Sequence, residues 1–156
     1  MASTDATERF AASASELGIE VAPRRYPEGT RTAVDAAAAV GCDVGQIVKS
    51  LVLMAGDQPV LVLCSGANRV DLAKVAAEFD GEVRMANADE VRAATGFAIG
   101  GAPPFGHPVP LATLVDPHLL TFDEVWAAAG RPDSVFPLTP ETLVAGSGAR
   151  PIDIAT

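Results

Sequence analysis

The sequence contains few of the residues that build metal centres and disulfide frameworks. It has two cysteines, Cys42 and Cys64, and two histidines, His107 and His118. Zinc ligands occur at short, regular spacings, and none of these four residues is spaced in that way. A disulfide framework needs more cysteines, so a reducing compartment suits this composition. We therefore expect no metal ion and no cofactor.

Long hydrophobic runs are also missing. The longest apolar stretches, such as residues 59–64, have the length of a β-strand. A membrane-spanning helix would need about 20 consecutive apolar residues. The first residues show neither a basic start nor a hydrophobic signal core. These features predict a cytoplasmic protein without a membrane partner.

Basic residues are scarce relative to acidic ones. The chain has 11 Lys and Arg against 20 Asp and Glu, for a net charge of −9. This charge argues against DNA as a partner and against nonspecific coating of RNA, because both require a basic face. One RNA end could still dock on a local patch. Two basic patches are possible. One is formed by Arg24, Arg25 and Arg31, and the other by Arg69 and Lys74. In the simpler interpretation, both are solvated surface.

Length and composition predict one globular domain over residues 1–156. Apolar residues make up 49% of the chain and charged residues 20%, which is ordinary for a folded protein. Hairpins mixed with helices, without strict alternation, predict an α+β fold with a mixed, mostly antiparallel sheet flanked by helices. Periodicity, caps and turn residues predict helices over residues 7–17, 33–40, 71–79, 87–96 and from 139 onward, and strands over 19–26, 47–54, 60–64, 82–86, 111–115, 125–129 and 135–138.

Lys49 is the one charged residue in the apolar strand predicted over residues 47–54. Strand alternation places it on a face with apolar neighbours. A lysine on such a face either reaches solvent at the rim or lines a pocket for an anionic or carbonyl group, and the pattern leaves both open. A two-residue turn at 57–58 would place Gly66 opposite Lys49 and leave room for a ligand.

Residues 95–107 contain four glycines and two adjacent prolines. Glycine allows positive φ and lets a ligand approach the bare backbone. The Gly100-Gly101 pair could donate two N–H groups to a carbonyl or phosphate oxygen, as an oxyanion hole does. A tight bend explains the pair equally well.

Three further residues have both a functional and a structural interpretation. Asp116, before Pro117, could orient a lysine, but a turn residue is the favoured interpretation. His107 could be a general base, although its loop position favours a side chain facing solvent. Tyr26 could line a site or pack as a strand aromatic. No serine–histidine–acid order, phosphate loop or carboxylate pair is present, so spacing alone identifies no reaction.

Four segments carry a resemblance to a known family. They are Gln46-Ile-Val-Lys-Ser-Leu-Val, Arg69-Val-Asp-Leu-Ala-Lys, Met85-Ala-Asn-Ala-Asp-Glu-Val and Thr95-Gly-Phe-Ala-Ile-Gly-Gly-Ala-Pro-Pro-Phe-Gly. In this order they resemble the YbaK/ProX family, the freestanding relatives of the editing domain inserted in bacterial prolyl-tRNA synthetases. The resemblance implies a strongly curved, mostly antiparallel sheet surrounded by helices. It also implies an enzyme that hydrolyses the ester of mischarged aminoacyl-tRNA.

The resemblance implies roles for individual residues. Lys49 corresponds to the lysine that contacts the substrate near the scissile ester and is needed for activity. Gly100 and Gly101 correspond to glycines that line the substrate pocket. Tyr26 corresponds to a pocket tyrosine, and Asp116 to an aspartate at the end of a strand.

Two positions depart from the pattern of the Cys-tRNA(Pro) deacylases in that family. Ser50 follows the lysine where those enzymes have threonine, and Ala128 stands where they have a hydroxyl residue. In those enzymes the substrate's own thiol is thought to attack the ester, so the details of the pocket decide specificity. Ser50 therefore joins the expected substrate-binding residues. Alanine, serine and threonine become alternatives to cysteine.

The predicted function is a trans-editing hydrolase, without metal or cofactor, that acts on tRNA(Pro) carrying a small amino acid. Lys49 and the glycine amides would position the ester, and water, a tRNA hydroxyl or the substrate side chain would attack. The expected partners are the acceptor end of mischarged tRNA and prolyl-tRNA synthetase or other translation factors. The acidic surface favours a second interpretation, a noncatalytic module that binds an aminoacyl or nucleotide-like ligand or a synthetase. A Schiff-base lysine enzyme is a third, and it would need a carbonyl substrate.

Overall fold

A computed structural model describes residues 5–27, 30, 32–79 and 81–156. The strands are β1 (Arg24–Arg25), β2 (Ile47–Ala55), β3 (Gln58–Ser65), β4 (Val83–Met85), β5 (Ala112–Val115), β6 (Val125–Ala128), β7 (Ser134–Leu138) and β8 (Arg150–Pro151). The helices are α1 (Ala6–Glu16), α2 (Ala33–Val40), α3 (Leu72–Ala76), α4 (Ala88–Thr95) and α5 (Pro140–Ser147), with 3₁₀ helices at Val44–Gln46 and Pro117–Thr121.

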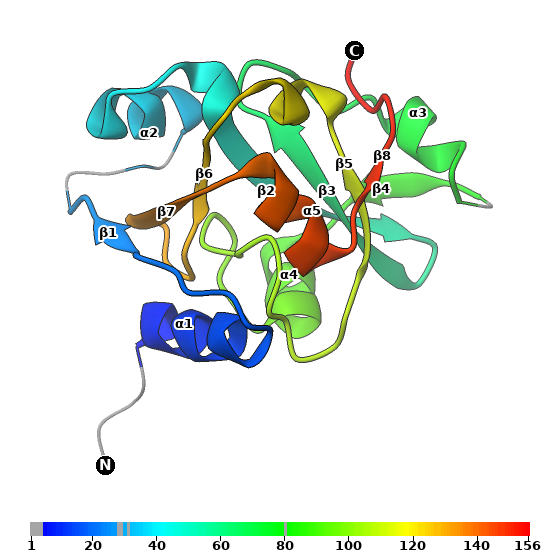
Figure 1. Cartoon of the computed structure of the whole chain (residues 1–156). Helices are drawn as coiled ribbons and strands as arrows, with labels where there is room; N and C mark the ends of the chain where they lie inside the picture. The colour runs from blue at the N-terminus through cyan, green and yellow to red at the C-terminus, as the bar shows by residue number, and fades with distance from the viewer. Residues whose placement is uncertain (1–4, 28–29, 31, 80) are drawn as a thin grey trace.

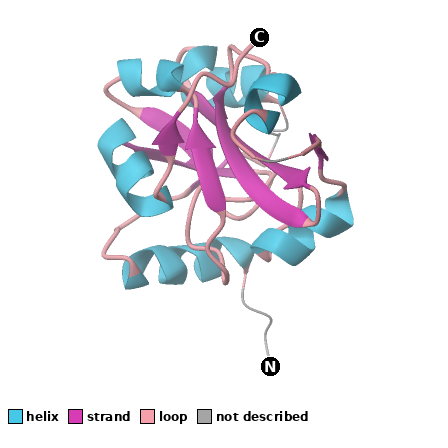
Figure 2. Ribbon diagram, turned by 90° about the vertical axis from the view of Figure 1, so that its right-hand side faces the viewer, coloured by secondary structure: helices cyan, strands magenta, loops and turns pink. Residues whose placement is uncertain are grey.

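The eight strands within the described ranges form one sheet in the order β1-β7-β6-β2-β3-β5-β8, with β4 paired to β2 (Figure 1). Four of the strand pairings are antiparallel and three are parallel. The strands twist strongly, and helices lie above and below them in the side view (Figure 2). The α+β fold with a mixed, mostly antiparallel sheet is confirmed. None of the described helices combines the length and apolar character needed to cross a membrane.

Strand β2 is the centre of the sheet and has three partners. One edge pairs with β3 from Val48 to Ala55. The other edge is shared, because β6 pairs with Ile47 and Val48 while β4 pairs from Leu53 onward. Between these two partners, no strand in the described part of the chain pairs with residues 49–52 on this edge. The sheet therefore opens beside the middle of β2.

The helix ends follow from capping residues in the sequence. The Thr32 hydroxyl accepts a hydrogen bond from the Asp35 N–H at the start of α2, and Gly41 ends that helix in the left-handed conformation. Asn87 and Glu90 form a reciprocal capping box at the start of α4. These interactions satisfy backbone N–H groups that a helix terminus leaves without partners. The predicted boundaries of both helices are confirmed.

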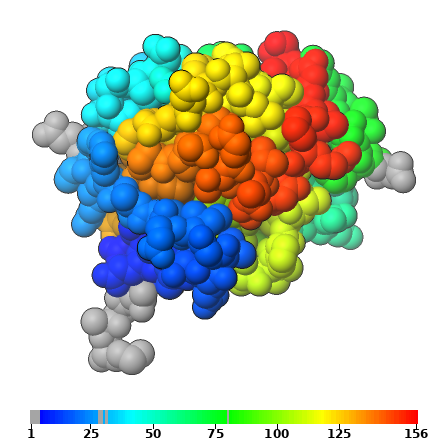
Figure 3. Space-filling view, in the orientation of Figure 1, coloured from blue at the N-terminus to red at the C-terminus, as the bar shows by residue number. Residues whose placement is uncertain are grey.

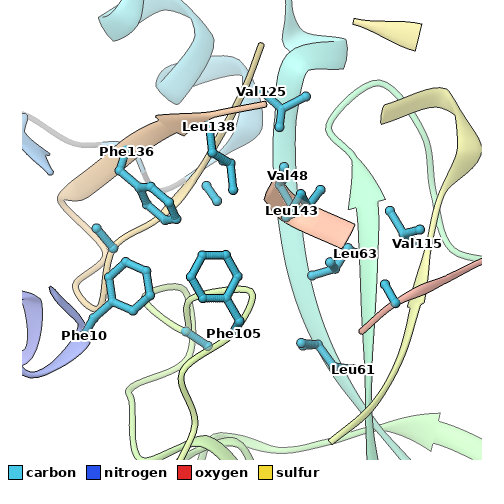
Figure 4. Packing of buried hydrophobic residues seen from close by; sticks show 14 of the residues in the cluster. Phe10, Val48, Leu61, Leu63, Phe105, Val115, Val125, Phe136, Leu138 and Leu143 are labelled. Carbon is cyan, nitrogen blue, oxygen red and sulfur yellow. The ribbon is translucent and has the colours of Figure 1, made fainter. Parts of the chain in front are cut away.

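The main hydrophobic core is organised around three phenylalanines from distant parts of the chain. Phe10 comes from α1, Phe105 from the glycine-rich segment and Phe136 from β7, and their ring centroids lie 5.0–6.0 Å apart (Figure 4). In the space-filling view, α1 (blue) lies directly against the region of β7 and α5 (orange) (Figure 3). The glycine-rich segment is therefore anchored in the core at Phe97 and at residues 101–105, whereas Ile99 and Gly100 remain exposed.

The strand predicted over residues 19–26 was wrong in length. Only β1 pairs, through two residues, with the end of β7. Ile19 and Val21 instead pack, partly buried, against the main core from an irregular segment. The β-rich composition of this segment could not show that the sheet edge offers so few partners.

The predicted turn of the central hairpin was also wrong, by one residue. Gly56 and Asp57 form it, and Gly56 has a φ of +62°, which the first position of a tight hairpin turn favours. Lys49 therefore faces Cys64, while the Gly66 N–H donates to the Ile47 carbonyl oxygen at 2.7 Å. A Cβ on Gly66 would collide with the Val44 carbonyl oxygen, so this glycine serves close packing.

Gly101 also serves a close approach between two backbones. It is buried, its N–H donates to the Ala98 carbonyl at 2.9 Å, and its carbonyl accepts from the Gly130 N–H at 2.9 Å. A Cβ at this position would lie 2.9 Å from the Arg131 Cα. Side chains larger than hydrogen would force the glycine-rich segment away from the β6–β7 loop.

We expect Gly101→Ala to lower the free energy of unfolding by about 1–3 kcal/mol, because the added methyl meets backbone that cannot rotate away. The matched control is Gly100→Ala in the same turn, where a Cβ would meet only Pro132 at 3.9 Å. The control variant adds a side chain at positive φ and should lower the free energy of unfolding by roughly 1 kcal/mol. Urea unfolding of both variants measures the difference. A Gly101→Ala variant as stable as the wild type would contradict the packing role.

Candidate functional site

A cavity of about 440 Å³ opens where β4 and β6 leave the edge of β2 uncovered. Residues 47–52 of β2 form its floor, and Lys49 is the only charged side chain among the described residues that line it. A mostly apolar pocket with a few polar groups is typical of a small-molecule site. Its apolar walls include Ala36, Val91, Ala102, Trp126 and Val135.

Lys49 is half-buried and its ammonium group is held in place. Nζ donates a hydrogen bond of 2.5 Å to the Asn68 carbonyl oxygen. The residue across the strand pair is Cys64, and burial raises the pKa of its thiol to about 11. The thiol is therefore protonated at neutral pH, and Lys49 has no thiolate beside it. Of the two interpretations left open by the sequence, the pocket-lining one fits this geometry.

Asp116 is linked to Lys49 through an intermediate residue. It is 3% exposed and stands at the end of β5. Its Oδ2 accepts from the Asn68 side-chain amide at 2.8 Å and from the Ser65 N–H at 3.1 Å, and its Oδ1 accepts from the His118 N–H at 3.0 Å. Asp116 is thus a turn residue, and Asn68 links its carboxylate to Lys49.

Asn68, which no sequence motif singled out, connects Lys49 with Asp116. Its side chain binds Asp116 while its main-chain carbonyl binds Lys49. A carbonyl oxygen is present in every residue, so no side-chain pattern could have identified this contact. The only local signal was an asparagine in the turn that follows β3, a common turn residue.

Ser50 lies on the opposite face of β2 from Lys49 and also lines the cavity. Its Oγ is buried and has no hydrogen-bond partner within the described residues. Leaving a buried hydroxyl unpaired costs about 1–3 kcal/mol, so the group is suited to bind a ligand atom. Ala128 lines the same cavity. Both departures from the Cys-tRNA(Pro) deacylase pattern therefore face the candidate site.

The two adjacent glycines have different positions. Gly100 lines the cavity with a φ of +85°, a conformation that favours glycine. Gly101 is not among the lining residues, and its N–H is already bonded to Ala98. The pair therefore does not offer two free N–H groups to one oxyanion in this geometry.

Tyr26 is not among the residues that line the cavity. It packs in a cluster with Ile47, Trp126 and Val135, three residues that do line the cavity. Its own N–H donates to the Asp133 carbonyl at 2.8 Å. Tyr26 is thus placed beside the lining and not within it.

His107 belongs to a different part of the molecule. It lines a separate hollow between α1 and the glycine-rich segment, and its Nε2 lies 2.8 Å from the Pro103 carbonyl oxygen. The side chain is half-buried and not solvent-facing, and this burial lowers its pKa. His107 is not among the residues that line the cavity with Lys49.

The basic patches expected from the sequence are partly used in internal contacts. Arg24 stacks over the Trp126 ring at 5.1 Å, and Arg25 pairs with Asp133 at 3.2 Å. Lys74 pairs with Asp153 at 2.9 Å. Arg31 lies outside the described residues. The described residues contain no group of three or more His, Cys, Asp or Glu side chains placed to hold a metal ion.

The chain is similar to proteins that edit aminoacyl-tRNA. The model of the aminoacyl-tRNA editing domain matches residues 27–145. A solved structure described as a candidate trans-editing enzyme for prolyl-tRNA synthetase superimposes with a TM-score of 0.93 at 43% identity, covering 99% of both chains.

Two curated bacterial proteins are similar over most of their length. YwhH of Bacillus subtilis, which is uncharacterised, is 33% identical over 119 residues, or 76% of each chain. EbsC of Enterococcus faecalis, described as a candidate Cys-tRNA(Pro)/Cys-tRNA(Cys) deacylase, is 26% identical over 84% of this chain and 81% of its own. As its resemblance to YbaK proteins predicted, the chain belongs to the aminoacyl-tRNA editing domain family.

Proposed function

We propose that this protein is an aminoacyl-tRNA deacylase that acts in trans on tRNA carrying a small, wrongly attached amino acid, with tRNA(Pro) as the first tRNA to test. One observation carries the proposal: a single lysine, held in a fixed position, on the floor of an apolar cavity of about 440 Å³ in an editing-domain chain. The names of the relatives EbsC and the prolyl-tRNA synthetase trans-editing structure support the same reaction.

Lys49 would stabilise the negative charge that develops on the ester carbonyl oxygen. The ammonium group has three donors, and Asn68 uses one of them. The remaining donors are available to the substrate inside a cavity where apolar walls strengthen the interaction. Attack on the carbonyl carbon breaks its bond to the ribose oxygen. When water attacks, the products are the free amino acid and a tRNA with its terminal hydroxyl restored.

No side chain of the protein needs to act as the nucleophile in this proposal. The Cys64 thiol, with a pKa of about 11, stays protonated at neutral pH. Water, a tRNA hydroxyl or the substrate side chain would attack, and the protein would supply position and charge. Ser50 and Ala128 line the cavity and are placed to contact the amino-acid side chain of the substrate.

A noncatalytic module that keeps the same cavity is the second candidate function. The net charge of −9 favours it, because an acidic surface repels the bulk of a tRNA. The two candidates differ in one measurement. An enzyme releases amino acid from mischarged tRNA(Pro) over many turnovers, whereas a binding module releases none above the uncatalysed rate.

Lys49→Ala should abolish deacylation while the fold remains intact. Removing one charge-assisted interaction that forms in the transition state should raise the activation free energy by about 3 kcal/mol, which lowers the rate roughly a hundredfold or more. The matched control is Lys74→Ala. Lys74 is the only other lysine in the sequence, and it lies on helix α3. Steady-state release of amino acid and circular dichroism provide the two readouts. Unchanged turnover in a folded Lys49→Ala protein would remove Lys49 from the mechanism.

Asn68→Ala should lower kcat by about tenfold with little change in KM, because the loop keeps its carbonyl but no longer has the bond to Asp116 that positions it. Arg69→Ala is the matched control, since Arg69 is exposed and follows directly in the same loop. Both variants are assayed well below their melting temperatures. A change in melting temperature with kcat unaffected would show that the Asp116–Asn68 contact serves stability alone.

Ser50→Thr should change the ranking of substrates more than it lowers the best rate. One methyl or hydroxyl in an apolar pocket is worth about 1–3 kcal/mol, so discrimination among small amino acids should be graded. We expect the wild type to act on more than one of the Ala-, Cys-, Ser- and Thr-charged tRNAs and not on Pro-tRNA(Pro). Ala128→Ser is the companion variant at the second position that departs from the Cys-tRNA(Pro) deacylase pattern. Wild-type activity confined to Cys-tRNA(Pro) would contradict this expectation.

A further inference from the structure

Three arginines from separate parts of the chain line a second hollow beside the cavity. Arg9 comes from α1, Arg92 from α4 and Arg131 from the β6–β7 loop, and the hollow has a volume of about 370 Å³. Pro132 lines both spaces. The glycine-rich segment also borders both, contributing Ala98 to the hollow and the following residues 99–100 to the cavity. The hollow therefore lies next to the space that contains Lys49.

The positive charge of this hollow is only partly balanced within the protein. Arg131 pairs with Asp5 at 3.2 Å and with Asp133 at 3.0 Å, which fixes the β6–β7 loop against α1. Arg9 makes no ion pair with a described residue. Its guanidinium donates to the Gly96 carbonyl at 3.2 Å and stacks over the Phe97 ring at 4.8 Å.

Arg92 is the least constrained of the three. Its side chain is exposed and forms no ion pair or hydrogen bond with any described residue. Arg9 and Arg92 thus bring two unbalanced guanidinium groups to one hollow in a chain whose net charge is −9. Guanidinium groups bind phosphate through paired N–H donors, and such contacts are stronger than neutral hydrogen bonds.

We propose that this hollow binds the phosphate of the 3′-terminal nucleotide of the tRNA whose ester occupies the cavity. The inference rests on the proposed function. The aminoacyl group is attached to the ribose of the last nucleotide, so a backbone phosphate must lie just outside the cavity when the ester reaches Lys49. Contacts to phosphate position a nucleic acid without reading its sequence. A single local site also allows an acidic protein to hold one RNA end while repelling the rest.

The experiment compares two substrates that differ in phosphate. One is mischarged tRNA, and the other is the same amino acid esterified to adenosine without any phosphate. For Arg92→Ala we expect KM for the tRNA to rise about fivefold or more. The dependence of this KM on salt should weaken as well, by roughly 0.7 in logarithmic slope for each phosphate that the variant no longer binds. The increase in KM should be confined to the substrate that carries phosphate.

The matched control is Arg150→Ala. Arg150 is exposed and pairs with Glu78 at 3.3 Å, and its strand β8 lies at the end of the sheet opposite to β1 and β7. Unchanged KM for tRNA in both Arg92→Ala and Arg92→Glu would overturn the phosphate site and leave the deacylase proposal intact. An equal increase in KM for the tRNA and for the aminoacyl adenosine would also overturn the phosphate site, because Arg92 would then be shaping the cavity.

A direct binding measurement separates this inference from the reaction itself. Fluorescence anisotropy of labelled, uncharged tRNA should show weaker binding to Arg92→Glu than to the wild type and to Arg150→Glu. This result would support the phosphate site even if the wild type hydrolysed no ester, an outcome that would refute the proposed function alone. Equal Kd values for the three proteins would overturn the phosphate site.

Discussion

The shared edge of β2 is the constraint on which the candidate site depends. Two strands pair with opposite ends of this edge, β6 in parallel and β4 antiparallel, and neither extends along its middle. The interval at residues 49–52 becomes a cavity floor made of regular strand, which holds side chains more rigidly than a loop does. Because this edge is uncovered, Lys49 and Ser50 can both line the same cavity although they lie on opposite faces of one strand.

The position of Lys49 depends in turn on a chain of hydrogen bonds that leaves the strand. A half-buried ammonium group needs polar partners, and the one it has among the described residues is a main-chain oxygen in the turn after β3. That turn is fixed by Asp116, which is buried and satisfied by three N–H donors. The carboxylate is therefore connected to the lysine through Asn68 and makes no ion pair with it among the described residues. The thiol opposite the lysine adds no competing charge, since Cys64 remains neutral at physiological pH.

The sequence predicted the fold class, the helix caps and the position of Lys49 on an apolar strand, because each depends on residues close together in the chain. It failed where tertiary context decides. It also missed a local cue, because Gly56 favours positive φ and the hairpin turn forms at residues 56–57 and not at the predicted 57–58. Glycine at positions 66 and 101 suggested space for a ligand, whereas each in fact admits neighbouring protein atoms. Asn68 could not be found, because its contribution is a carbonyl oxygen.

The cluster of Phe10, Phe105 and Phe136 has a consequence for the dynamics of the site. The glycine-rich segment supplies one wall of the cavity, and Phe105 anchors this segment to α1 and β7. The wall and the first helix therefore belong to one cooperative unit, in which local opening of either exposes the same aromatic surface. Unfolding of α1 would remove the Phe10 contact that holds Phe105 in this segment. The N-terminal helix contributes no residue to the cavity lining, yet through Phe10 it packs against the segment that forms one of the cavity walls.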